Sequence, residues 1–131
     1  MAKIAFVEVT RQYKGASSPA VDAVSFEVPE GAVCMLLGTS GSGKTTLLRM
    51  VNRLIEPTAG AIFIDGKNIL EGNPIELRRS MGYVIQQVGL FPHMNIEENI
   101  SITARISGGW NRQELRQRAD QLLELVGLPP Q

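Results

Sequence analysis

The residues best suited to chemistry form one glycine-rich stretch, Gly38 to Thr45, with the sequence GTSGSGKT. It fits the pattern G-x-x-x-x-G-K-[ST], in which backbone amides form a nest for phosphate oxygens. Gly38, Gly41 and Gly43 allow backbone angles that a side chain would forbid, so the chain can close around an anion. A helix that begins here adds the positive end of its dipole. The stretch therefore predicts a site for a nucleoside triphosphate.

Three residues at the end of this stretch have side chains that suit the phosphates and their metal ion. Lys44 is long enough to reach the β- and γ-phosphates, and the Thr45 hydroxyl is a suitable ligand for Mg²⁺. Thr46 follows by one position, where its hydroxyl is expected to bond the α-phosphate. The predicted nucleotide-binding residues of the loop are Gly38, Thr39, Ser40, Gly41, Ser42, Gly43, Lys44, Thr45 and Thr46.

A strand before the loop and a helix after it have to hold this site in place. Ala32–Leu37 is an uninterrupted apolar run, which predicts a strand buried on both faces of a parallel sheet, with Cys34 as a buried thiol. After Lys44 the apolar residues recur at helical spacing, which predicts an amphipathic helix that stops before Pro57. Without a ligand, the same pattern describes an ordinary strand–turn–helix, and this alternative stays open. The apolar face of the helix consists of Leu47, Leu48, Val51, Leu54 and Ile55.

Further strands are predicted on both sides of this unit. Lys3–Val9 and Val24–Val28 are rich in β-forming residues. Ala61–Ile64 is a short strand, and the Asp65-Gly66 pair that follows is a strong hairpin signal. Met81–Ile85 is expected to form another strand.

Asparagine marks the predicted start of each remaining helix, because its side chain can accept hydrogen bonds from the free amides of the first turn. Asn73 is the expected cap of a short helix, and the last helix of the chain is expected to end at Gly127. Two further starts have the capping-box pattern, with a glutamate three residues after the asparagine. These boxes pair Asn95 with Glu98 and Asn111 with Glu114.

The composition restricts the setting in which such a site would work. The 131 residues include 13 Lys and Arg against 13 Asp and Glu, so we expect no general nucleic-acid-binding surface. A single cysteine excludes an internal disulfide. Glu8 interrupts the N-terminus too early for a signal-peptide core, and no apolar run approaches the ~20 residues of a membrane span. The expected location is the cytoplasm, with any membrane contact made through a partner.

The motifs resemble those of the ATP-binding subunits of ABC transporters, over nearly the whole chain. GTSGSGKTTLL is similar to the Walker A motif of that family, although Thr39 stands where proline is more common. The resemblance implies that Tyr13, in RQYKG, stacks on the adenine of ATP. MGYVIQQ resembles the family's Q-loop, which implies that Gln86 senses Mg²⁺ and the γ-phosphate, with Gln87 as the neighbour for which it can be mistaken. Lys44 and Gln86 are then the catalytic residues in this part of the domain.

A closer resemblance concerns importers of quaternary-amine osmoprotectants such as glycine betaine, carnitine and choline. It rests on the stretches NRLIEPTAG, LRRSMGYVIQQVGLFPHM and IEENI. Transport specificity resides mainly in other subunits of such systems, so the solute is the least direct of these inferences.

The resemblance also implies the fold and the partners. It predicts a partial α/β P-loop NTPase fold of the ABC ATPase type: an antiparallel N-terminal β part, the P-loop strand and helix, and the start of the helical subdomain. The expected parts are a core of about residues 1–88 and a helical part of about 89–131. In the family, two ATPase copies sandwich two MgATP, and a transmembrane permease docks beside the Q-loop. The expected location is therefore the inner face of the cell membrane.

Several elements that the family needs for hydrolysis are missing from this sequence. Asp65 resembles the end of a Walker B motif, but Gly66 follows where a catalytic glutamate should stand. Ser107-Gly108-Gly109 imitates the signature motif but continues differently, and His93 lies far from a switch-histidine position. We expect the chain to be the N-terminal portion of a longer ATPase domain that does not turn over ATP alone. The alternatives are a module that only binds nucleotide, or another P-loop class such as a small kinase or GTPase.

Overall fold

The structure, a computed structural model, describes residues 3–87 and 89–129. The chain divides into two units, 1–82 and 83–131, and each is described by itself. The boundary expected beside residue 88 falls on a position outside the described residues. The elements are β1 Ile4–Arg11, β2 Val21–Val28, α1 Lys44–Val51, β3 Ala59–Ile64, β4 Lys67–Asn68, α2 Pro74–Arg79, α3 Ile96–Ser107 and α4 Arg112–Leu125.

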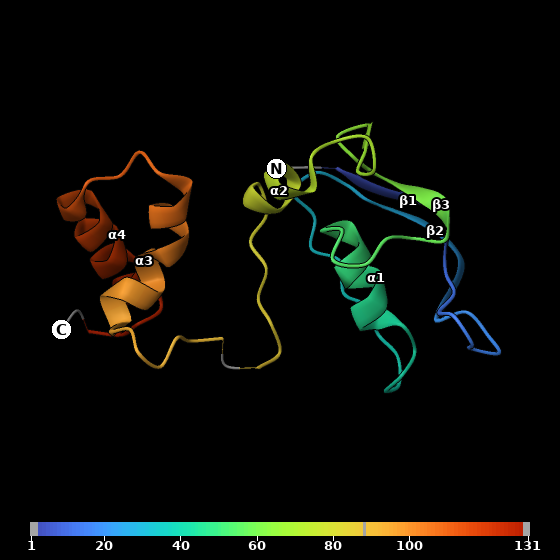
Figure 1. The fold of residues 1–131 in the computed structure, drawn as a ribbon, viewed down its shortest axis with the longest axis horizontal. Helices are drawn as coiled ribbons and strands as arrows, with labels where there is room; N and C mark the ends of the chain where they lie inside the picture. The colour runs from blue at the N-terminus through green and yellow to red at the C-terminus, as the bar shows by residue number, and fades with distance from the viewer. Residues whose placement is uncertain (1–2, 88, 130–131) are drawn as a thin grey trace. The chain divides into compact units, whose positions relative to one another are not determined.

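The first unit is built on an antiparallel sheet with the strand order β2-β1-β3-β4. Figure 1 labels β1, β2 and β3 of this sheet. Strand β1 extends two residues beyond the predicted Val9, and β2 begins at Val21 rather than at Val24. The hairpin predicted at Asp65-Gly66 is confirmed, because Ile64 pairs with Lys67 across it. The antiparallel N-terminal part of the expected fold is therefore present.

Bulges in the first two strands decide which side chains face the core. Glu8 and Ala23 have positive φ values of 49° and 44°, and the pairing register shifts at both places. Each bulge changes the alternation by one residue, so Val9 is buried on the same side as Phe6. The Glu8 N–H donates to Ser25 Oγ at 2.8 Å, which satisfies a backbone donor that the irregular ladder leaves free.

Gly60 lies opposite the Glu8 bulge, and we expect Gly60→Ala to lower the free energy of unfolding by about 3 kcal/mol. Its φ is +77°, and an added Cβ would lie 2.2 Å from the Glu8 carbonyl oxygen. Gly66 is the matched control, since it has the same φ but nothing within 4 Å of its Cβ position. Gly66→Ala should cost about 1 kcal/mol. Urea denaturation of both variants tests this, and equal losses would contradict it.

Helix α1 packs against one face of the sheet and buries Leu47 and Met50. The helix ends at Val51, so the prediction that it continues to Pro57 is wrong, and Leu54 is 51% exposed. Arg53 adopts a left-handed conformation that ends the helix early. The core consists of Phe6, Val9, Val21, Leu47, Met50, Ile62 and Ile69.

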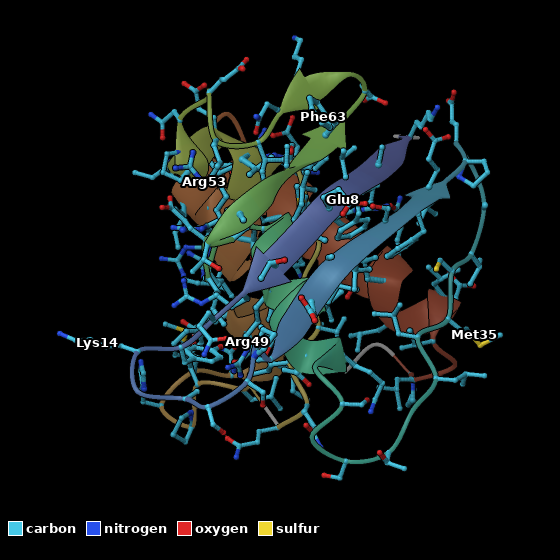
Figure 2. The ribbon with its side chains drawn as sticks, turned by 90° about the vertical axis from the view of Figure 1, so that its right-hand side faces the viewer. Glu8, Lys14, Met35, Arg49, Arg53 and Phe63 are labelled. Atoms are coloured by element: carbon cyan, nitrogen blue, oxygen red, sulfur yellow. The ribbon has the colours of Figure 1, made fainter. Side chains whose placement is uncertain are left out.

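The strand predicted over Ala32–Leu37 is absent, as is the one over Met81–Ile85. Val33, Met35 and Leu37 are 88%, 80% and 91% exposed, and Met35 projects away from the sheet in Figure 2. A strand needs a hydrogen-bonding neighbour, and none of the described segments pairs with these two runs. The sheet is consequently antiparallel throughout, and the predicted parallel part does not form.

Cys34 is exposed, which corrects the prediction of a buried thiol. We expect the native protein to react with a thiol reagent such as DTNB as fast as the urea-unfolded chain, within about a factor of five, because burial rather than chemistry protects a structural cysteine. A strand buried on both faces would slow the native reaction by orders of magnitude. Fast labelling supports the open Ala32–Leu37 segment, and strong protection would contradict it.

The second unit contains α3 and α4, and both predicted capping boxes are confirmed. The side chain of Asn95 accepts from the Glu98 N–H at 2.8 Å, and Asn111 accepts from the Glu114 N–H at 3.0 Å. Gly127 follows the end of α4 with a φ of 75°, as predicted for a C-terminal glycine. Among the described residues, no helix is long and apolar enough to cross a lipid bilayer.

Candidate phosphate-binding site

The glycine loop leads directly into α1, as the sequence predicts. Gly43 is the N-cap residue with a φ of 87°, and the helix begins at Lys44. No side chain caps this helix and no acidic residue lies in its first turn. Helices α2, α3 and α4 each begin at an asparagine whose side chain accepts from their first amides. The amides at the start of α1 are thus left for another acceptor, and the helix dipole favours an anionic one.

Two of the loop glycines have close neighbours, and the contact requires glycine at Gly43, where the neighbour is a backbone oxygen. An added Cβ on Gly43 would lie 2.2 Å from the backbone oxygen of Ala20, which precedes β2. An added Cβ on Gly38 would lie 2.6 Å from Ser42 Oγ. Gly41 also has a positive φ, of +82°, but open space around it. The loop therefore packs tightly against β2 at its helix end and stays open near Gly41.

The ammonium group of Lys44 lies within the loop. Its Nζ donates to the carbonyl oxygen of Gly38 at 2.9 Å, to that of Thr39 at 2.6 Å and to Ser42 Oγ at 3.1 Å. In the part of the chain that the structure describes, no carboxylate forms an ion pair with it. A cation held only by neutral, exposed acceptors can exchange them for phosphate oxygens. The role of Ser42 as an acceptor for Lys44 was missed by the sequence reasoning, although its spacing of two residues was a visible signal.

The two threonines that follow Lys44 occupy the first turn of α1. Thr45 is exposed and Thr46 is half-buried. The Thr45 hydroxyl is therefore accessible for a metal ion beside a bound phosphate. Thr39 and Ser40, at the other end of the loop, are also exposed. The structure thus brings the predicted residues 38–46 together in one loop and helix start.

A groove of about 430 Å³ runs beside the loop in the first unit. Its walls come from the start of β2, from the exposed segment before the loop, and from the loop and helix. The lining residues are Pro19, Ala20, Val21, Asp22, Val24, Met35, Leu36, Leu37, Ser42, Gly43, Lys44 and Leu47. Its size falls in the range of small-molecule sites.

Tyr13 lies in the loop after β1 and is 38% exposed. The guanidinium of Arg11 covers its ring, with Cζ at 4.8 Å from the ring centroid. The Ala16 N–H donates to the Tyr13 carbonyl at 3.1 Å and closes a turn, from which Lys14 projects into solvent (Figure 2). No hydrogen bond or ring contact joins Tyr13 to the glycine loop among the described residues, so its predicted role stays a prediction.

Gln86 belongs to the second unit and is exposed, as is Gln87. Nothing in the described structure distinguishes one glutamine from the other, and Val88 lies outside the described residues. His93 is also exposed, and its ring makes an edge contact with Phe91 at 5.9 Å between centroids. The predicted role of Gln86 toward a metal ion therefore stays a prediction.

The uncapped helix, the glycines at positive φ and the lysine within the loop define the P-loop class of nucleotide-binding proteins. The profile of the ABC transporter family matches residues 21–131, and the chain belongs to this family. The resemblance found in the sequence motifs is thereby confirmed.

The chain is similar to ATP-binding proteins of solute transport systems. The chain is 50% identical over 123 residues to the choline transport ATP-binding protein OpuBA of Bacillus subtilis, covering 94% of this chain and 32% of that protein. It is 52% identical over 117 residues to the osmoprotectant import ATP-binding protein OsmV of Salmonella typhimurium, covering 89% of this chain and 30% of that protein. The chain thus spans about a third of the length of these relatives.

Solved structures of the same type share the fold. The bacterial ABC transporter cassette MJ0796, in a dimeric structure, matches with a TM-score of 0.83 and 32% identity, over 93% of this chain and 56% of that one. A dimeric post-hydrolysis state of MJ0796 bound to ADP and phosphate matches with a TM-score of 0.82 and 31% identity, over 93% of this chain and 56% of that one. The chain therefore has a partial ABC ATPase fold.

Proposed function

We propose that this chain binds MgATP as part of the ATPase subunit of an ABC importer for quaternary-amine osmoprotectants. The observation that carries the proposal is the Lys44 ammonium inside a glycine loop at the start of an uncapped helix. Binding exchanges its contacts with Gly38, Thr39 and Ser42 for contacts with the β- and γ-phosphates. The backbone amides of residues 41–45 then cradle the same phosphates, and the Ser42 N–H gives up its bond to the Thr39 carbonyl to do so.

The proposed base contact involves Tyr13. Because Arg11 already covers one face of the ring, adenine has to stack on the opposite face. Stacking on an aromatic ring tolerates different bases, so this contact contributes affinity more than selectivity.

The proposed metal site uses oxygen ligands, which suit Mg²⁺. The exposed Thr45 hydroxyl is one protein ligand, and Gln86 is proposed as the second. No cluster of three or more His, Cys, Asp or Glu side chains suited to a metal occurs in the described ranges. One hydroxyl from Thr45 and one amide oxygen from Gln86 suit an Mg²⁺ ion that enters with the nucleotide. Such an ion keeps several waters and is usually bound through phosphates and few side chains. The bound ion neutralises charge on the phosphates.

We propose that residues 1–131 alone do not turn over ATP. The sequence has no Asp-Glu pair after an apolar strand to activate water, and Lys44 and Gln86 are the catalytic residues that it does supply. The proposed partners of the whole subunit are a second copy, as in the dimeric MJ0796 structures, and a permease that docks near Gln86. The proposed location is the inner face of the cell membrane.

A melting experiment tests nucleotide binding directly. At 100-fold excess over Kd, MgATP should stabilise the protein by about 2.7 kcal/mol. For a domain of this size the melting temperature should rise by about 10 °C. A rise in the melting temperature with MgATP, together with no displacement of ATP by GTP, supports the proposal. No rise at millimolar MgATP would overturn it for this chain, and a preference for GTP would point to another P-loop class.

The solute is tested in cells. Deleting the gene that carries this sequence should abolish the uptake of labelled glycine betaine, carnitine or choline under osmotic stress. Methionine uptake is the matched control, because a methionine importer subunit, MetN of Symbiobacterium thermophilum, is 41% identical over 124 residues. Loss of methionine uptake alone would contradict the osmoprotectant assignment and leave the nucleotide site untouched.

A further inference from the structure

The turn after α1 contains an arginine where helices usually end in glycine. Arg53 has a φ of 53°, and its N–H donates to the Met50 carbonyl at 3.1 Å. Its side chain is 12% exposed, and Nη1 donates to the carbonyls of Ile69 and Gly72 at 3.0 and 2.8 Å. Nη2 pairs with Glu56 Oε1 at 2.7 Å. The strained backbone is tolerated because the guanidinium ties the end of α1 to the turn after β4.

A second arginine reaches the same turn from α2. Arg78 Nε donates to the carbonyl of Asn52 at 3.0 Å, and Nη2 donates to the carbonyl of Arg53 at 2.6 Å. A cation at a helix C-terminus also complements the negative end of the dipole. Asn52 itself is 5% exposed, so the carbonyl that Arg78 holds belongs to a buried residue. The C-terminal turn of α1 is thus held on two sides by charge-assisted hydrogen bonds.

We infer that Arg53 and Arg78 are positioning residues for the phosphate loop, an inference that rests on the proposed function. Helix α1 has only 8 residues, and its first residue is Lys44. The apolar face of α1 packs on the sheet through Leu47 and Met50. This packing opposes movement of the helix away from the sheet more strongly than movement of the helix along its own axis. A helix this short moves as a rigid body, so a shift of its C-terminal turn displaces the amides that face the phosphates.

Two variants separate positioning from folding. Arg78→Lys keeps the charge but loses the planar fork that holds two carbonyls. Arg53→Gly removes the side-chain contacts and adopts the same left-handed backbone without strain. Arg79→Lys is the matched control, because the Arg79 side chain is exposed and, unlike that of Arg78, makes no hydrogen bond within the described part of the chain. Circular dichroism identifies the temperature at which every variant is folded, and all binding is measured there.

The readouts are Kd for MgATP and for tripolyphosphate, and the amide chemical shifts of residues 43–46. Arg78→Lys and Arg53→Gly should weaken both ligands by about fivefold, and shift these amides in the unliganded protein. Arg79→Lys should change neither. Lower melting temperatures with unchanged Kd and unchanged amide shifts would overturn the inference and leave the arginines a purely structural role. If the wild-type chain binds neither ligand, the proposed function fails, and the amide shifts alone still decide whether the arginines position the loop.

Discussion

Lys44→Ala should weaken MgATP binding by about 10- to 100-fold, because each charge-assisted hydrogen bond to phosphate contributes about 1.5–3 kcal/mol. The ammonium lies in the loop and is held by Gly38, Thr39 and Ser42, all neutral acceptors. Its removal deletes the only side-chain cation among loop residues 38–46. The measurement is a titration of both proteins with a fluorescent ATP analogue in the presence of Mg²⁺.

The same variant should barely change the stability of the unliganded protein. The acceptors of Lys44 are exposed, so water replaces the ammonium at them, and the loss should stay below about 1 kcal/mol. Lys67→Ala is the matched control, because Lys67 is an exposed lysine in the β3–β4 hairpin. It should leave Kd unchanged. Equal affinity of wild type and Lys44→Ala would show that nucleotide does not use this loop.

Gly43→Ala should lower the free energy of unfolding by about 3 kcal/mol, the other large effect expected here. The φ of Gly43 is 87°, and the added Cβ would lie 2.2 Å from the Ala20 backbone oxygen. Neither atom can rotate away, since the backbone of residue 43 fixes the position of the Cβ and the oxygen belongs to the main chain. The loop must leave β2 to relieve the overlap, so binding of MgATP should fall together with stability. Urea denaturation and the same titration measure both.

Gly41→Ala provides the comparison that isolates this contact. Gly41 has nearly the same φ, +82°, but nothing lies within 4 Å of its Cβ position. Only the left-handed strain applies, so the cost should be about 1 kcal/mol. If the two variants lost equal stability, the close approach of Gly43 to Ala20 would not exist in solution.

The helix caps and the hairpin could be predicted because their interactions are local. Asn95 bonds a residue three positions away, and the Asp65-Gly66 turn joins strands that are its immediate neighbours. The glycine loop has the same character, since Lys44 bonds acceptors two to six residues away. Residues that interact within a few positions are visible as a pattern in one sequence.

The strands predicted at Ala32–Leu37 and Met81–Ile85 do not form. An apolar run indicates that side chains are suited to burial, but it does not show which neighbouring strand would pair with the run. Whether a strand forms depends on backbone donors and acceptors supplied by another segment, which the run itself does not encode. The exposure of Cys34 follows from the same cause. The bulges at Glu8 and Ala23 were likewise invisible, because both residues adopt conformations that their types usually avoid.

The sequence by itself determined the glycine loop, the starts of the helices and the family, since each depends on residue types at short, fixed spacings. Only the tertiary structure decided where α1 ends and what holds its end. Arg53 takes a left-handed conformation because its side chain bonds the carbonyls of Ile69 and Gly72. The side chain of Arg78, 25 residues further along the chain, bonds the carbonyl of Arg53. Contacts between residues so far apart exist only after the chain has folded.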